Sequence, residues 1–175
     1  GIGEASAIKL ASEGFSVVLS GRTKKTLDMV ASKCKGKASV KALDVSSYED
    51  VKAVFEAIIS DYGRVDVLVA SAGLNAKNRN WHNVSEKDFD QIIKIDLNGV
   101  FYTNRLVLEK MKEQKGGLII NVSSWAGKYV TALTGPAYTA AKHGVNALTE
   151  GINMEAGHFG VRACAICPGE VATPI

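Results

Sequence analysis

The chain has 175 residues, and its 21 lysines and arginines against 18 aspartates and glutamates give a formal charge of +3. Hydrophobic residues make up 46% and charged residues 22%, values that are typical of a globular domain with a core and that exclude a disordered chain. The charge is too small and too scattered for a nucleic-acid or anionic-membrane partner, and no apolar run reaches the roughly 18 residues that span a bilayer.

The predicted elements alternate between helices and short apolar strands. An apolar helix follows Gly1-Ile2-Gly3, and Ser46 and Ser47 carry the capping signals of a later helix that ends at Gly63. Such alternation predicts an α/β fold, a doubly wound parallel sheet of the Rossmann type covered on both faces, in one domain over residues 1–175. The expected strands are 16–19, 38–43, 65–69, 118–122 and 161–167, and the other helices are 24–34, 85–114 and 136–159.

Two motifs carry the first chemical signals. Gly1 and Gly3 at a helix start allow close backbone approach to a phosphate, although an ordinary turn also explains two glycines. Tyr138 and Lys142 lie four residues apart on a predicted helix, so both side chains share one face. A neighbouring ammonium lowers the pKa of a phenol, which enables proton exchange with an alcohol or carbonyl; a surface Tyr–Lys contact is the simpler alternative.

Strand ends give that pair a context. Ser123 and Ser124 follow a predicted strand, and in open α/β sheets ligands bind beyond the carboxyl ends of the strands. A hydroxyl at that edge polarises a carbonyl group. The segments 70–73 and 168–173 follow two other strands and are expected at the same edge.

Together these motifs resemble the short-chain dehydrogenase/reductase family, in its shorter, soluble subtype, over essentially the whole chain. In chain order the matching motifs are Gly1-Ile2-Gly3, Leu43-Asp44-Val45, Ala72-Gly73, the strand-end Ser124, Tyr138-x-x-x-Lys142 and Pro168-Gly169-x-Val171-x-Thr173.

The resemblance implies a role for each matched residue. Tyr138 is the implied general acid/base, Lys142 lowers the Tyr138 pKa and holds the nicotinamide ribose, and Ser124 hydrogen-bonds the substrate oxygen. Hydride passes between the nicotinamide and a carbonyl or secondary alcohol. The implied cofactor contacts are Gly1, Ile2 and Gly3 at the phosphates, Asp44 and Val45 at the adenine, and Ala72, Gly73, Pro168, Gly169, Val171 and Thr173 along the strand ends.

The turn after the strand at 16–19 predicts the choice of cofactor. An NAD enzyme carries an acid there for the ribose 2′-hydroxyl, whereas this turn reads Ser20-Gly21-Arg22-Thr23-Lys24-Lys25. Arg22 offers two donors to a 2′-phosphate, so the sequence favours NADP over NAD; a merely solvated basic turn is the alternative.

Two substitutions depart from the family pattern. The family has asparagine three residues before the glycine that corresponds to Gly99, where it holds a water in the proton relay, and this chain has Asp96. An aspartate also holds a water, but its buried charge is costly unless it is paired or protonated, and we count Asp96 among the candidate catalytic residues. The family's Asn-Asn-Ala-Gly is here Ala70-Ser71-Ala72-Gly73.

The resemblance also implies segments outside this sequence. A strand and glycine turn are expected before Gly1, in the middle of the sheet between the strands at Val17 and Val67, and a substrate lid and last strand after Ile175. Without the central strand, the sheet is expected to divide into two halves, at about 1–3 kcal/mol for each buried unpaired backbone group. We therefore expect these residues alone not to form a stable, active enzyme.

Partners and location follow from the remaining features. Helices 85–114 and 136–159 are apolar around much of their circumference, and in the resembling family they pair between subunits, which predicts a homodimer or homotetramer; a monomer is the alternative. Three cysteines that cannot all pair and the lack of a secretory signal predict a cytoplasmic location. Histidines 82, 143 and 158 show no metal spacing.

The competing function is a non-catalytic nucleotide-binding or interaction protein. Asp96 and the expected missing segments favour this alternative. The presence of Ser124, Tyr138 and Lys142 together argues against it.

Overall fold

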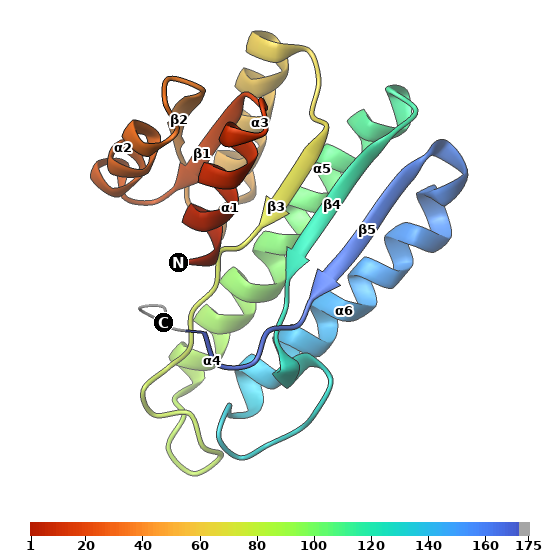
Figure 1. Cartoon of the computed structure of the whole chain (residues 1–175). Helices are drawn as coiled ribbons and strands as arrows, with labels where there is room; N and C mark the ends of the chain where they lie inside the picture. The colour runs from red at the N-terminus through yellow and green to blue at the C-terminus, as the bar shows by residue number, and fades with distance from the viewer. Residues whose placement is uncertain (172–175) are drawn as a thin grey trace.

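Residues 1–171 are described by a computed structural model, shown in Figure 1. Helices and strands alternate along the chain, and all strand pairs are parallel. The elements in order are α1 (Ile2–Ser12), β1 (Val17–Gly21), α2 (Lys24–Lys33), β2 (Ala38–Ala42), α3 (Tyr48–Tyr62), β3 (Val67–Ala70), α4 (Glu86–Ile93), η1 (Lys94–Asn98), α5 (Gly99–Glu113), β4 (Gly117–Val122), η2 (Trp125–Gly127), α6 (Pro136–Ala156), η3 (Gly157–Phe159) and β5 (Val161–Ile166).

The described strands form two sheets. β1 pairs with β2, in a register that sets Leu19 opposite Val40, and β3, β4 and β5 form a second sheet in that order. A cavity of about 790 Å³ lies between the two sheets and is lined by both β1 and β3, whose facing edges are unpaired. The predicted α/β fold and its division into two halves are confirmed.

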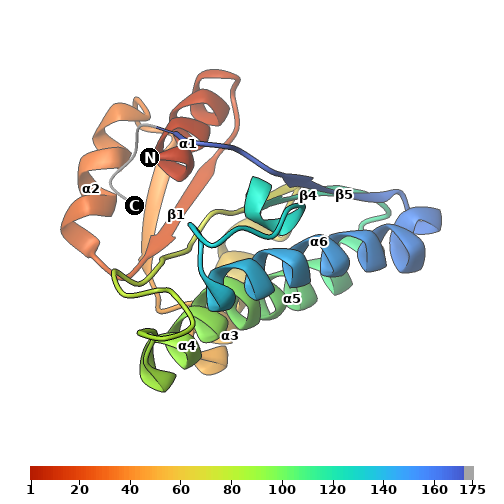
Figure 2. The ribbon, with the colours of Figure 1, turned by 90° about the horizontal axis from the view of Figure 1, so that it is seen from below.

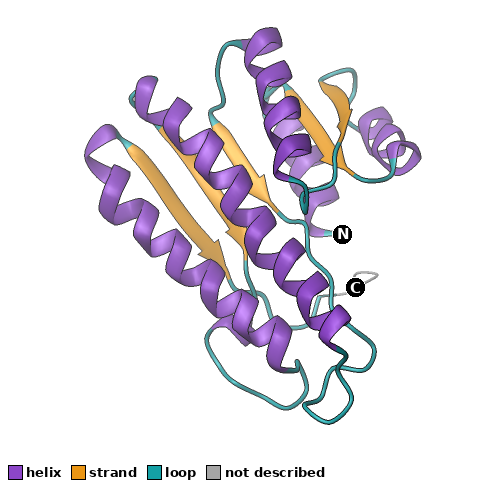
Figure 3. Cartoon of the chain, turned by 180° about the vertical axis from the view of Figure 1, so that it is seen from behind, coloured by secondary structure: helices purple, strands orange, loops and turns teal. Residues whose placement is uncertain are grey.

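Helix cover differs between the faces of the larger sheet. Helices α3, α5 and α6 lie on one side of β3, β4 and β5, as Figure 2 shows from below and Figure 3 from behind. On β5, Val161 is fully buried, whereas the alternate residues Arg162, Cys164 and Ile166 are exposed. The expectation of helices on both faces is therefore wrong for β5 in the described chain, because no helix among residues 1–171 covers its second face.

Local signals explain where the helices begin and end. Ser47 caps α3 by accepting the N–H of Asp50, and Gly63 ends α3 in the left-handed conformation, with a φ of 73°. The predicted helix 85–114 is instead three pieces, since a π-helical turn, η1, separates α4 from α5. Such turns widen the helix locally and are frequent at functional sites.

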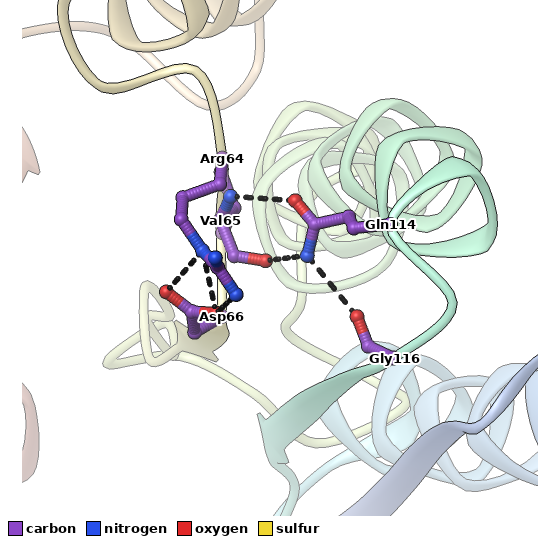
Figure 4. Close-up of polar contacts among 5 residues, drawn as sticks. All are labelled: Arg64, Val65, Asp66, Gln114 and Gly116. Carbon is purple, nitrogen blue, oxygen red and sulfur yellow. Dashed lines mark hydrogen bonds and ion pairs between the residues drawn. The ribbon is translucent and has the colours of Figure 1, made fainter.

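A glutamine side chain aligns the start of β3 with β4, as Figure 4 shows. Gln114 accepts the N–H of Val65 (3.0 Å) and donates to the carbonyls of Val65 (2.7 Å) and Gly116 (3.1 Å). These bonds satisfy backbone groups just before the sheet ladder begins. The carboxyl ends of β3, β4 and β5 consequently reach a common edge, where the candidate site lies.

Candidate active site

Tyr138 and Lys142 lie on the first turns of α6, beside the end of β4. The link between the two elements is tight: the Ser123 hydroxyl donates to the Lys142 carbonyl (3.1 Å), and Asn146 donates to the Gly127 carbonyl (2.9 Å). A Cβ on Gly127 would lie 2.6 Å from the Lys142 carbonyl oxygen, so only glycine permits this approach. This packing holds Ser124 against α6.

Tyr138 and Ser124 lie beside each other at the centre of the site. Burial raises the pKa of Tyr138 above its ordinary value, the hydrogen bond with Ser124 lowers it, and the negative charge of Asp96 raises it. The net direction is upward, so the lowering of the Tyr138 pKa expected from Lys142 is not what this structure shows. The physical reasons are the partial burial of the phenol and the carboxylate beside the lysine.

Lys142 is buried together with Asp96. Its Nζ lies 3.3 Å from Oδ2 of Asp96, donates to the Val122 carbonyl (3.1 Å) and stands 5.3 Å from the centre of the Tyr138 ring. The other oxygen of Asp96, Oδ1, accepts the N–H of Leu74 (2.9 Å). Burial raises the pKa of Asp96, and Lys142 and this hydrogen bond oppose the rise.

Gly73 covers this ion pair. A Cβ on Gly73 would lie 3.0 Å from Oδ2 of Asp96 and 3.3 Å from Nζ of Lys142. The predicted Ala72-Gly73 segment thus reaches the part of the edge where Lys142 lies, and its glycine leaves room for two buried charges.

The predicted phosphate turn lies at the same edge. Gly3, in the first turn of α1, packs so closely on Ser71 that a Cβ would collide with the serine hydroxyl. Gly1 is the N-cap of α1, and the start of a helix attracts anions through its unpaired N–H groups. The glycines therefore fit a phosphate group near the end of β3.

The residues predicted to meet the adenosine end lie beyond β1 and β2. Arg22 follows β1 and is exposed, and its charge helps to lower the pKa of Asp44, after the larger effect of hydrogen bonds from Ser46. Val45 packs on Gly99 at the start of α5, at 3.0 Å from the position of a Cβ. Arg22 and Asp44 therefore lie near each other at the ends of the two-stranded sheet. The contact of Val45 with Gly99 joins the end of β2 to α5.

The segment after β5 meets the serine turn. The Trp125 N–H donates to the Pro168 carbonyl (2.9 Å), and the Ser123 N–H donates to the Ile166 carbonyl (2.8 Å). Val171 is about half exposed. The predicted contact at Thr173 lies outside the described residues.

The sequence alone did not show the Asp96–Lys142 pair. Asp96 departs from the family pattern in sequence, but its burial against Lys142 depends on three features of the fold: the π turn of η1, the cover by Gly73 and the position of α6. The available signal was the single acid in a mostly apolar helical stretch, Ile92 to Val100.

The parallel sheets, the glycine turn at a helix start and the serine, tyrosine and lysine at the strand ends define a Rossmann-type dehydrogenase site. A family model described as short chain dehydrogenase matches residues 1–175, and the chain belongs to this family.

Three known proteins illustrate the similarity. The chain is 33% identical to the 3-oxoacyl-(acyl-carrier-protein) reductase FabG of Thermotoga maritima, over all of this chain and 72% of that protein. The crystal structure of levodione reductase superposes with a TM-score of 0.95 at 32% identity, over 99% of this chain and 69% of that one. An alcohol dehydrogenase from Thermococcus sibiricus, solved with 5-hydroxy-NADP, gives 0.91 at 30% identity, over 99% and 73%.

Two further findings concern the length of the chain relative to its relatives and its helices. The chain spans between 64% and 76% of the length of the curated relatives it matches. Within residues 1–171, every helix is too short or too polar to cross a membrane.

Proposed function

We propose that the chain is an NADP(H)-dependent oxidoreductase that interconverts a carbonyl and a secondary alcohol. The observation that carries the proposal is that Tyr138 lies beside Ser124 and the buried Lys142, whose Nζ stands 5.3 Å from the centre of the Tyr138 ring, at the edge where three strands end. The family membership supports it, since FabG and levodione reductase are named as reductases.

Each residue has a defined task in this reaction. Ser124 orients the substrate oxygen, and Tyr138 donates a proton to that oxygen in reduction or accepts it in oxidation. Lys142 supplies the positive charge beside the phenol, and its side chain stays fixed because the Val122 carbonyl and Asp96 hold the ammonium. The nicotinamide, when bound, supplies or accepts the hydride, and in this proposal Gly1, Gly3, Asp44 and Val45 hold the dinucleotide.

The preference for NADP rests on Arg22. Of the three cations in its turn, Lys24 is paired with Asp28 at 2.8 Å, while Arg22 forms no ion pair among the described residues. A guanidinium grips a phosphate with two parallel hydrogen bonds, whereas an acid would repel it. The relative solved with 5-hydroxy-NADP supports the same choice.

Replacement of the tyrosine hydroxyl tests the reaction. Tyr138→Phe is expected to lower turnover of NADPH with a ketone by about 10²–10⁴-fold, the range of general acid–base catalysis, and to leave NADPH affinity intact. Tyr62→Phe, which removes a hydroxyl hydrogen-bonded to Ser39, is the matched control and keeps turnover. If the natural protein binds NADPH but reduces no carbonyl in a panel of ketones, the non-catalytic nucleotide-binding protein replaces this proposal.

Removal of the arginine tests the cofactor. Arg22→Ala is expected to raise the Kd of NADPH by roughly 10–100-fold, since a charge-assisted hydrogen bond contributes about 1.5–3 kcal/mol, and to change that of NADH little. Fluorescence titration of both nucleotides measures the ratio, with Lys9→Ala as a charge-matched control. Equal losses for the two nucleotides would remove the NADP preference.

The proposal includes a homo-oligomer that pairs through α5 and α6. Phe101 on α5 is 42% exposed and Met154 on α6 is 84% exposed, so both helices carry apolar surface outside the sheet. Sedimentation of the wild type against Phe101→Lys tests this pairing, and a monomer in both cases would reject it.

A further inference from the structure

Asp96 is the one fully buried acid among residues 1–171. It lies in the π turn η1, and its two oxygens have different surroundings: Oδ1 accepts the Leu74 N–H, while Oδ2 faces the Lys142 ammonium at 3.3 Å without another hydrogen-bond donor. A buried carboxylate is costly unless a partner compensates it, and here the partner is the lysine of the candidate site.

The lysine has little freedom within this arrangement. Nζ donates to the Val122 carbonyl at 3.1 Å and pairs with Asp96, and the backbone of Gly73 closes over both charges. The Lys142 side chain is 4% exposed. A swing of the ammonium toward solvent would break both contacts and leave the carboxylate alone.

The pair also changes the charge that Tyr138 experiences. An ammonium 5.3 Å from the ring centre favours the phenolate, and a carboxylate 3.3 Å from that ammonium makes the pair neutral overall. With asparagine in place of Asp96, the lysine charge would act on the phenol without opposition.

We propose that Asp96 is a positioning residue that holds the Lys142 ammonium on the Val122 carbonyl and cancels its charge at Tyr138, so that proton exchange at the phenol needs a more alkaline medium than with asparagine at this position. The kinetic part of this inference rests on the proposed oxidoreductase function, whereas the ionisation of Tyr138 does not. The upward effect of Asp96 on the Tyr138 pKa agrees with it.

The other titratable groups around the pair are peripheral. His143 on α6 is exposed, and its ring lies 2.9 Å from the Thr139 carbonyl; the segments after β3 and β4 contribute serines and backbone groups. Asp88 on α4 is half-buried. The exposed charged residues on the packed elements are Lys94 in η1, Glu86, Lys87 and Asp90 on α4, Arg105, Glu109 and Glu113 on α5, Glu150 and Glu155 on α6, and Lys128 after η2.

The first test compares Asp96→Asn with Asp90→Asn, a matched loss of one exposed carboxylate on α4. The pH profile of kcat for alcohol oxidation is measured with NADP. Asp96→Asn is expected to move the rising limb down by about one pH unit, which makes oxidation near pH 7 roughly tenfold faster, while Asp90→Asn leaves the profile in place. A profile for Asp96→Asn that coincides with the wild type overturns the inference.

The second test needs no turnover, and its first comparison needs no variant of the buried acid. The ultraviolet difference between wild type and Tyr138→Phe during alkaline titration isolates the Tyr138 phenolate. The wild-type phenol is expected to ionise above pH 10, the ordinary value, and at a lower pH in the Asp96→Asn background than in the wild type. A wild-type phenol that ionises below pH 10 overturns the inference even if Asp96→Asn fails to fold. A chain that turns over no substrate but shows this titration rejects the enzyme alone and keeps the role of Asp96.

Discussion

The two sheets differ in how completely they are packed. Around β3, β4 and β5 the core includes Met111, Ile119 and Val161, none of which is exposed at all. Around β1 and β2 the buried cluster is Ala7, Leu19 and Val30, each 5–9% exposed, and the cavity borders it. The larger sheet with its helices is therefore the rigid half of the molecule.

The residues proposed for proton exchange and those proposed for cofactor recognition lie in different sheets. The proton-exchange residues Ser124, Tyr138 and Lys142 belong to the well-packed half, where buried contacts fix their geometry. Arg22 and Asp44 belong to the two-stranded half and lie nearer to solvent. Chemistry requires fixed distances, whereas recognition of a long cofactor tolerates adjustment at its far end, so the difference in packing matches the difference in task.

The largest expected difference concerns core truncation. Ile119→Ala on β4 should lower the free energy of unfolding by about 4 kcal/mol, because a fully enclosed side chain leaves a cavity that cannot collapse. Leu19→Ala on β1 should cost about 2 kcal/mol, since its surroundings already border open space. Urea unfolding of the two variants measures both values.

Met154→Ala is the control for the core comparison. Met154 is 84% exposed, so its truncation should change stability by less than about 0.5 kcal/mol. Equal losses at Ile119 and Leu19 would show that the two halves are packed alike and would remove the comparison.

Two glycines of the well-packed half differ in the space around them, so replacing each with alanine tests how tightly that half is packed. Gly73→Ala places a Cβ 3.0 Å from the Asp96 carboxylate, which cannot move away while it is paired, and should cost about 1–3 kcal/mol. Gly151→Ala, on α6, meets nothing within 4 Å and should stabilise by about 0.5–1 kcal/mol through helix propensity. The two midpoints in urea should move in opposite directions, and a Gly73→Ala protein as stable as the wild type would mean that the ion pair is loose.

The sequence predicted most of the fold because the hydrophobic periodicity of the elements and the glycines that end them were both clear. Gly63 and Gly160 end elements with φ of 73° and 78°, and the apolar runs mark all five strands to within two residues. The π turn was missed because hydrophobic spacing at 3.6 residues continues through it.

Site residues were predictable as a set, but their mutual electrostatics were not. The spacing of Tyr138 and Lys142 places both on one helix face. Asp96, the ion-pair partner of Lys142, lies 46 positions earlier in another element. Burial of Asp96 depends on Gly73 and on α6 together, so no local pattern reveals that the Tyr138 pKa is raised rather than lowered.

The smallest effect is a pair of opposite pH dependences, one in each half. The pKa of Asp44 is lowered below 3.8 by hydrogen bonds from Ser46, so its contribution is present above pH 3.8 and is lost as the pH falls through the folded-state pKa. Burial raises the pKa of Asp96 above 3.8, so its contribution is present below pH 3.8 and is lost as the pH rises through its folded-state pKa. The stability of wild type minus Asp44→Asn should therefore rise with pH below 3.8, and that of wild type minus Asp96→Asn should fall with pH above it. Urea unfolding from pH 3 to 7 gives both differences, with Asp90→Asn as the control for the loss of an exposed carboxylate. Parallel slopes for the two aspartates would mean that Asp96 is stabilised as a carboxylate by Lys142 more strongly than burial opposes it, and would remove this difference between the two halves.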